Sequence, residues 1–220
     1  SNLFVSDHPL IKHKLTKLRD EKTKPKQFRD LIRELAVLLT YEGTRSCQLS
    51  DLTIQTPVGS CEGKEFKNQI ALVPILRAGL GMLEGTLEAI PFASVWHLGL
   101  YRNEETLEPV QYYNKMKEEQ VSEAGCIFVL DPMLATGGSL VAAIKALKDK
   151  GAKTVKVLAI LGSSQGVANV QKSFPDVEIF LAGLDEHLNE VGYIVPGLGD
   201  AGDRQYGTVQ LNLCICGKGA

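Results

Sequence analysis

The sequence predicts an α/β fold with an open, mostly parallel sheet flanked by helices. Short apolar runs rich in β-branched residues are typical of strands that are covered on both faces of a parallel sheet. They span residues 70–76, 95–100, 126–130, 155–161 and 177–182. Segments with helical spacing of apolar residues separate most of these runs. This alternation favours an open sheet that binds ligands beyond the carboxyl ends of its strands.

Two helices and a hairpin are predicted before the first of these strands. The helices span residues 8–20 and 26–41, and apolar residues recur in the second at helical spacing, namely Phe28, Leu31, Ile32, Leu35, Leu38 and Leu39. Residues 53–56 alternate between polar and apolar before Pro57-Val58-Gly59, which predicts a short β-arm. Farther along, a helix over Leu140, Ile144 and Leu147 is expected to stop at Gly151.

The size of the chain is sufficient for one domain with its own core. It has 220 residues, of which 44% are hydrophobic, and no linker or repeat interrupts it. We predict a single domain over residues 1–209, with a small C-terminal hood, and a tail of unknown role over residues 210–220. Because an apolar run long enough to span a membrane and a secretory pattern are both absent, we expect a cytoplasmic protein without a membrane partner.

Charge and cysteine content narrow the function classes further. Basic residues gather between Lys12 and Arg29, which we interpret as a solvated helix face, with contact to an anionic partner as the alternative. The formal net charge of -2 argues against a generic nucleic-acid binder. Five scattered cysteines do not describe a disulfide framework, and Cys214 and Cys216 lack histidines at zinc-site spacing. We therefore expect no protein-held metal site.

The most informative segment is a strand, a glycine-rich turn and a helix start around Asp131. The apolar run ends at this acid, and Thr136, Gly137, Gly138 and Ser139 follow before the helix. Amides at a helix start carry partial positive charge, and glycines let an anion approach them closely. The hydroxyls add donors, while the carboxylate can accept hydrogen bonds from ribose hydroxyls. We call residues 131–139 the phosphate cradle; a capped helix without a ligand is the alternative.

Several motifs, taken together, resemble one enzyme family. DPMLATGGS at 131–139 is similar to the phosphoribosyl pyrophosphate (PRPP) site of the phosphoribosyltransferases, in the form carried by the uracil phosphoribosyltransferase family. VPILRAGLGM at 73–82, GYIVPGLGDAGDRQYGT at 192–208, HPLIKHKL at 8–15 and GLYRNEETLEP at 99–109 agree with it. The resemblance covers about residues 7 to 209 and implies the phosphoribosyltransferase fold. A GxxxxGK[ST] loop is absent, which argues against a P-loop kinase.

The resemblance implies which residues bind PRPP. They are Asp131, Pro132, Met133, Leu134, Ala135, Thr136, Gly137, Gly138, Ser139, Arg77, Arg102 and Asp200. Arg77 and Arg102 follow predicted strands, and their guanidinium groups can pair with diphosphate oxygens in a bidentate way. We expect Arg77, Arg102 and Asp200 to be the catalytic residues, with Asp200 assisting at N1 of the base or orienting the ribose.

The resemblance also implies a binding loop for uracil. Ile194 and the segment Gly199, Asp200 and Ala201 are expected to contact the base. Tyr193 and Met133 are our own addition from chemistry, because an aromatic and a polarizable side chain can enclose a planar ring; ordinary packing is the alternative. The same loop contains Gly197-x-Gly199-x-x-Gly202, a dinucleotide-binding pattern, but Pro196 precedes it and no helical pattern follows it. We therefore reject a dinucleotide site.

The implied activity is that of a pentosyltransferase in pyrimidine salvage, which joins uracil and PRPP to give UMP and pyrophosphate. Many phosphoribosyltransferases carry two acids in a row after the strand, whereas Pro132 follows Asp131 here. We therefore expect Mg²⁺ to be held mainly by PRPP oxygens and water. A homodimer or larger homo-oligomer is expected. Two alternatives stay open: a phosphoribosyltransferase for another base, and a nucleotide-sensing RNA-binding regulator on this fold.

Overall fold

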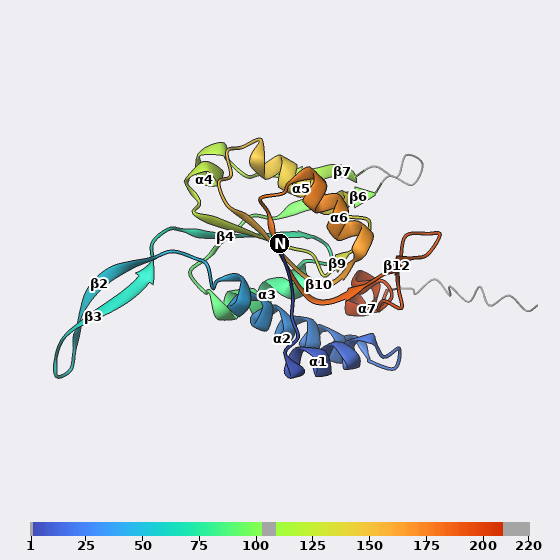
Figure 1. Cartoon of the computed structure of the whole chain (residues 1–220), viewed down its shortest axis with the longest axis horizontal. Coiled ribbons are helices and arrows are strands. Elements are labelled where there is room, and N and C mark those ends of the chain that lie inside the picture. Colours follow the sequence, from blue (N-terminus) through green and yellow to red (C-terminus); the bar gives the residue numbers. More distant parts are fainter. Residues whose placement is uncertain (1, 103–108, 209–220) are drawn as a thin grey trace, which may run out of the picture.

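The computed structural model describes residues 2–102 and 109–208, which form a mostly parallel sheet between two layers of helices (Figure 1). The spatial order of the strands is β1 (Leu3–Val5), β11 (Glu178–Asp185), β10 (Val155–Ser163), β8 (Cys126–Leu130), β4 (Ile70–Leu76), β6 (Leu98–Arg102) and β7 (Pro109–Asn114). Neighbouring strands are parallel except β6 and β7. Short β9 (Met133–Leu134) lies beside β10. The predicted fold class is confirmed.

Helices cover both faces of the sheet. One face carries α1 (Pro9–Arg19), α2 (Pro25–Gly43) and α3 (Leu80–Ala89), and the other carries α4 (Glu118–Glu123), α5 (Gly138–Lys148) and α6 (Ser164–Ser173). Successive strand residues alternate between the two cores: Leu72 packs with the first helical layer and Val73 with the second. Both faces are therefore apolar, which explains the nearly continuous hydrophobic runs.

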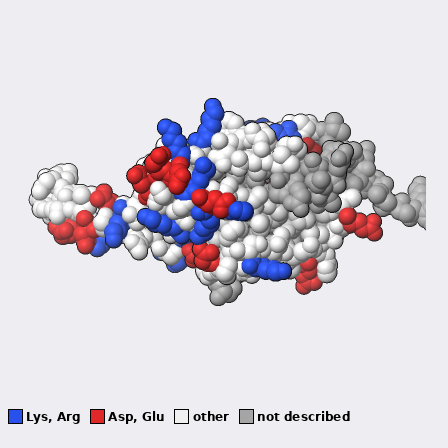
Figure 2. Space-filling model, turned by 90° about the horizontal axis from the view of Figure 1, so that it is seen from above, with Lys and Arg blue, Asp and Glu red and all other residues white. Residues whose placement is uncertain are grey.

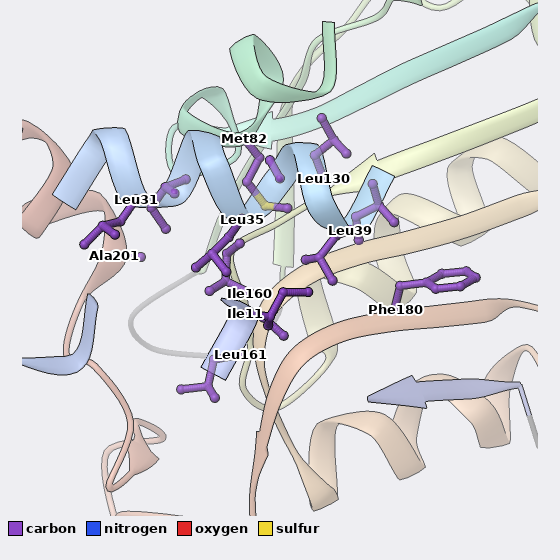
Figure 3. Packing of buried hydrophobic residues seen from close by; sticks show 14 of the residues in the cluster. Ile11, Leu31, Leu35, Leu39, Met82, Leu130, Ile160, Leu161, Phe180 and Ala201 are labelled. Carbon is purple, nitrogen blue, oxygen red and sulfur yellow. The ribbon is translucent and has the colours of Figure 1, made fainter. Parts of the chain in front are cut away.

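Helix α2 is the centre of the first layer. Leu31, Leu35 and Leu39 lie on its inner side, and Met82 of α3 and Ile160 of β10 pack in the same cluster (Figure 3). Each of these side chains is at most 6% exposed. Burial of a leucine contributes about 1.5–3 kcal/mol. The predicted helices over 8–20 and 26–41 are thus confirmed as α1 and α2.

Two appendages extend from this body. The β-arm is β2 (Leu49–Thr56) paired with β3 (Gly59–Phe66), and it projects well beyond the sheet (Figure 1). It is longer than predicted, because its strands are exposed on both faces and the apolar alternation marks only part of them. The hood consists of β12 (His187–Leu188), β13 (Ile194–Val195) and α7 (Ala201–Tyr206). The predicted tail over 210–220 lies outside the described residues.

The prediction of one continuous strand over residues 95–100 is wrong. The segment is divided into β5 (Ser94–Val95), which pairs with Ala71 and Leu72 of β4, and β6, which pairs with Ile75 and Leu76. Pro74 lies between the two pairings and has no N–H for a ladder hydrogen bond, which accounts for the break. The second segment also continues to Arg102, which is the last residue of β6 rather than a residue beyond the strand.

The statement that no helix follows the glycine pattern at 197–202 is also wrong. Helix α7 begins at Ala201, and the Asp200 side chain caps it by accepting from Asp203 N at 2.8 Å. Its buried residues are Ala201, Arg204 and Gln205, so hydrophobic periodicity cannot mark it. The preceding strand β13 pairs only with β12, in antiparallel orientation, and this is not the parallel βαβ unit that a dinucleotide site requires.

Within the described residues, none of the helices is long and apolar enough to cross a membrane.

Candidate active site

The predicted site residues gather at the carboxyl edge of the sheet. Strands β4 and β8 are parallel neighbours, with Pro74 opposite Leu130, so Arg77 and Asp131 follow them at the same edge. Gly79 brings the turn after β4 against the end of β8: a Cβ on Gly79 would lie 2.4 Å from the Leu130 carbonyl oxygen. The glycine therefore permits a close backbone approach between the two segments that carry Arg77 and Asp131.

The phosphate cradle is a concave turn at the start of α5. Gly137 has φ of 84°, a left-handed conformation that glycine adopts without steric cost, and α5 begins at the next residue. A cavity of about 170 Å³ lies over this turn. Its lining includes Asp131 and every residue from Met133 to Ser139, together with Leu140 and Gly192. The amides at the start of α5 and the Thr136 and Ser139 hydroxyls therefore belong to one small, polar concavity.

Side chains from the end of β10 and from α6 support the cradle from behind. Ser163 Oγ donates to the Ala135 carbonyl oxygen at 2.5 Å and accepts from Gly166 N at 2.9 Å. Asn169 Nδ2 donates to the Thr136 carbonyl oxygen at 3.0 Å. Two consecutive carbonyls of the turn are thus held by hydrogen bonds, which leaves its amides oriented before any anion arrives.

Asp131 is the acidic group of this cavity. Removal from bulk water raises the pKa of its carboxyl group to about 7, although its Oδ1 accepts a hydrogen bond from Met133 N at 3.2 Å. Pro132, immediately beyond it, is buried and does not line the cavity among the described residues. The carboxyl group therefore changes protonation state near neutral pH, where its ability to accept hydrogen bonds changes as well.

A second cavity, of about 340 Å³, adjoins the cradle. Its lining includes all six residues predicted for the base: Met133, Tyr193, Ile194, Gly199, Asp200 and Ala201. Ala135, Val191 and Gly192 complete it. Met133, Ala135 and Gly192 line both cavities, so the two lie next to each other at these three residues. We call Ile194–Ala201 the base loop.

Long-range polar contacts fix the base loop. Asp185, only 8% exposed, accepts from Gly197 N at 2.9 Å and forms a two-pronged ion pair with Arg19 at 2.7 and 2.6 Å. Arg19 Nη1 also donates to the Gly197 carbonyl oxygen at 2.8 Å. The hydrogen bonds from Arg19 and Gly197 N lower the pKa of Asp185 against the effect of its burial. Helix α1 thus supplies a support for a loop almost 180 residues away.

Two titratable side chains of the second cavity lie near each other. Burial, together with the carboxylates of Asp200 and Asp203, raises the pKa of the Tyr193 hydroxyl. Asp200 is exposed, and one of its oxygens already caps α7. Asn189 holds the turn before Tyr193, because its Oδ1 accepts from the amide of that residue at 2.8 Å. Tyr193 is therefore a neutral, half-buried ring at physiological pH.

The two predicted arginines are less closely tied to these cavities. The Arg77 side chain is exposed and is not among the described residues that line either cavity, although Tyr206 Oη lies 3.4 Å from its carbonyl oxygen. The peptide bond before Arg77 is cis. Arg102 ends β6, the neighbour of β4, and its side chain lies outside the described part of the structure.

Sequence reasoning missed three residues of the site: Leu140, Val191 and Gly192. Gly192 lies in the quoted motif at 192–208 and has φ of 85°, but an isolated glycine gives no sign that it joins two cavities. Among the described residues, no group of three or more His, Cys, Asp or Glu side chains could hold a metal ion. Cys214 and Cys216 lie outside the described residues, and Cys126 is a buried free thiol.

Charged groups outside the site are largely mixed in sign. On the face shown in Figure 2, Lys and Arg side chains are mixed with those of Asp and Glu, mainly toward the end that carries the β-arm. In the basic N-terminal segment, Lys14 pairs with Glu34 at 2.5 Å, Lys26 with Asp30 at 2.8 Å, and Arg19 with buried Asp185. Several basic residues of this segment therefore form ion pairs with acidic residues of the same fold.

Comparison with known proteins identifies the family. The family model described as uracil phosphoribosyltransferase matches residues 5–208. Uracil phosphoribosyltransferases of Alkaliphilus metalliredigens and Brevibacillus brevis are 54% and 52% identical, and each alignment covers 94% of this chain and 99% of the relative. A solved protein structure from Aquifex aeolicus superposes with a TM-score of 0.89 at 39% identity, covering 95% of this chain and 99% of that one.

A more distant structure shows how far the fold extends. Adenine phosphoribosyltransferase of Trypanosoma brucei has a TM-score of 0.51 at 13% identity and covers 83% of this chain and 84% of its own. That likeness concerns the fold alone. The match over residues 5–208 and the relatives that are more than half identical settle the assignment. The chain belongs to the uracil phosphoribosyltransferase family, and its activity is the transfer of a phosphoribosyl group to uracil.

Proposed function

We propose that the two adjoining cavities divide the substrates between them, with the 5′-phosphate and ribose of PRPP in the phosphate cradle and uracil against the base loop. The observation that carries this proposal is that the two cavities lie side by side and share Met133, Ala135 and Gly192 in their linings. A base in the larger cavity then faces the sugar in the smaller one. Asp131 accepts hydrogen bonds from the ribose hydroxyls, and the amides at the start of α5 bind the phosphate.

Catalysis in this proposal comes from alignment and charge stabilisation. N1 of uracil attacks C1′ of the ribose while the diphosphate leaves, and the negative charge grows on the departing oxygens. Arg77 follows β4, Arg102 ends the adjacent strand β6, and both pair with that diphosphate. Asp200, at the junction of the base loop and α7, assists at N1 or orients the ribose.

Uracil recognition relies on the backbone of the base loop. Ile194 and the segment from Gly199 to Ala201 offer amides and carbonyls to the polar edge of the base, and Tyr193 and Met133 enclose its faces. Cytosine carries an amine in place of one carbonyl and an acceptor in place of one N–H. It would leave buried groups unpaired, which can reduce kcat/KM by about 10⁴.

We also propose that Mg²⁺ enters the site with PRPP. Asp131 is the acid available in the cradle, and a set of three protein ligands is not found among the described residues, so the donor set fits an ion held by substrate oxygens and water. When bound, the ion would neutralise charge on the diphosphate.

A panel of bases tests this assignment. The purified chain is incubated with PRPP, Mg²⁺ and radiolabelled uracil, cytosine, orotate, hypoxanthine or adenine, and nucleotide products are separated. UMP should form from uracil, with the other bases at least a hundredfold slower, and EDTA should suppress the reaction. Faster use of another base, or full activity in EDTA, would contradict the base site or the metal proposal respectively. RNA retention on a filter by the same preparation would instead favour the regulatory alternative.

We further propose that the chain works as a homodimer or larger homo-oligomer. The β-arm exposes Leu49, Leu52, Ile54 and Val58, and a two-stranded ribbon of this kind is marginally stable without a packing partner. Sedimentation equilibrium should give at least twice the mass of the 24.0 kDa chain. Ile54→Glu should reduce that mass, whereas the arm variant Glu62→Gln should not. A monomer at micromolar concentration would refute the proposal.

A further inference from the structure

Arg204 of α7 is a buried cation beneath the base loop. It is 6% exposed, and Nη1 donates to the carbonyl oxygens of Leu198 and Leu18, each at 2.8 Å, while Nη2 donates to that of Asp20 at 2.5 Å. Its guanidinium lies 4.4 Å from the centre of the Phe28 ring. One side chain thus joins α1, α2 and the base loop.

The partners of Arg204 explain how the charge is tolerated. Among the described residues it forms no ion pair with a carboxylate. Instead it donates hydrogen bonds to carbonyl oxygens at the C-terminal end of α1, where the last carbonyls lack helical partners and the helix dipole is negative. The guanidinium thus supplies hydrogen-bond donors to carbonyl oxygens at the end of α1, and its Nη1 also donates to the Leu198 carbonyl oxygen in the base loop.

The bond to Leu198 has a direct consequence for Gly199. The Leu198 carbonyl and the Gly199 N–H belong to one planar peptide unit, so they point in opposite directions. A fixed carbonyl therefore fixes the direction of that N–H. Gly199 lines the larger cavity with φ of 80°, a conformation open to many peptide orientations without such a restraint. Arg19, through Gly197, restrains the preceding peptide in the same way.

We propose that Arg204 is a positioning residue for the base: it holds the Leu198 carbonyl so that the Gly199 N–H points into the uracil cavity. The inference rests on the proposed placement of uracil against the base loop. The cradle residues are not among the hydrogen-bond partners of Arg204, so the effect should fall on the base rather than on PRPP.

Steady-state kinetics of Arg204→Met and Arg204→Lys test the proposal on the full chain, with each substrate varied at saturating levels of the other. In Arg204→Met, the KM for uracil should rise about tenfold or more, while the KM for PRPP changes less than about twofold. Arg204→Lys keeps the positive charge but lacks the several N–H donors of the guanidinium. Its KM for uracil should therefore lie between those of the wild type and Arg204→Met. If Arg204→Met fails to fold, Arg204→Lys decides on the same criterion.

Lys156→Met is the matched control. Lys156 is also a buried cation, 2% exposed, and it donates to the Gly43 carbonyl oxygen at 2.8 Å and to Ser46 Oγ at 2.6 Å. It lies near the amino end of β10, away from the carboxyl edge of the sheet. This variant should lose thermal stability yet keep the KM for uracil.

Two results would overturn the proposal: an equal rise in both KM values in the Arg204 variants, or a KM for uracil that rises no more than in Lys156→Met. Absence of UMP formation by the wild-type chain would instead remove the proposed function on which the inference rests.

Discussion

The phosphate cradle and the base loop border the same pair of cavities but are stabilised in different ways. The cradle is contiguous, from Asp131 to Ser139, and its conformation follows from a strand end, a left-handed glycine and a helix start. The base loop depends on Arg19, Asp185 and Arg204, whose contacts join segments that are far apart in the chain. The conformation of the anion site thus follows mainly from local backbone geometry, with added hydrogen bonds from Ser163 and Asn169, whereas the base loop depends on contacts with segments much farther away in the chain.

This difference has a physical origin. Phosphate binding needs several parallel amides, which any helix start provides. Recognition of one base against another needs donors and acceptors at fixed positions, and a short loop cannot fix them alone. The base loop therefore depends on α1 and α7 for support. We expect substitutions at the glycine turn of the cradle to affect mainly PRPP, and substitutions in the supports of the base loop to affect mainly uracil.

The largest effect is expected for Gly138→Val. A Cβ at this position would meet only Thr136 Oγ1, at 3.7 Å, so the fold should persist. The valine side chain would cover the amides at the start of α5, and PRPP affinity should fall by about a hundredfold or more, because each charge-assisted hydrogen bond contributes about 1.5–3 kcal/mol. Calorimetry with PRPP measures this.

Gly137→Val is the contrasting variant. Its Cβ would lie 2.8 Å from the Gly166 carbonyl oxygen, in a backbone conformation that valine rarely adopts, so it should lower stability as well as affinity. Wild-type affinity of Gly138→Val for PRPP would mean that the cradle does not bind the phosphate.

Asp200→Asn should have the next largest effect. Asparagine caps a helix as well as aspartate does, so α7 should be retained. If the carboxylate assists at N1 or orients the ribose, kcat/KM should fall by about 10². Asp203→Asn, a neighbour on the first turn of α7, is the control and should remain near wild type. Unchanged turnover and substrate affinities in Asp200→Asn would exclude both roles.

Asp131 should make the PRPP affinity of the cradle depend on pH. Its pKa is raised to about 7, so the neutral form predominates below that pH and the carboxylate, the better acceptor for ribose hydroxyls, above it. PRPP affinity should therefore increase as pH rises through about 7. Asp131→Asn should bind PRPP more weakly and without this step, which separates the carboxyl group from titration of the substrate phosphates.

The raised pKa of Asp131 also predicts that the stability of the fold falls with rising pH, whereas PRPP affinity increases. The carboxyl group is more easily ionised in the unfolded chain, near its ordinary pKa of 3.8, so the wild-type fold loses stability as pH rises from about 4 to about 7. Asp131→Asn should therefore melt at a higher temperature than wild type at pH 8 and show little difference at pH 4. Equal melting temperatures at both pH values would contradict the raised pKa.

The sequence could predict the cradle but not the supports of the base loop. Asp131, Thr136 and Ser139 occur in order within one segment, and strand direction alone places them at the functional edge. The buried face of α7 is polar, so its helix leaves no hydrophobic pattern, and Arg204 resembles a surface residue in sequence. The break between β5 and β6 likewise could not be predicted. It depends on Pro74 of the neighbouring strand β4, and hydrophobic periodicity does not show which strands are neighbours.

The smallest effect is expected where the two regions meet. Met133 belongs to the cradle segment and lines both cavities, yet its proposed role is only to enclose one face of the base. Met133→Leu conserves volume and hydrophobicity, so the KM for uracil should rise only about twofold to threefold and the KM for PRPP should not change. Met133→Ala removes the enclosing side chain and should raise the KM for uracil further. A larger change in the KM for PRPP than in that for uracil would show that Met133 acts on PRPP like the rest of the cradle, and would contradict its proposed contact with the base.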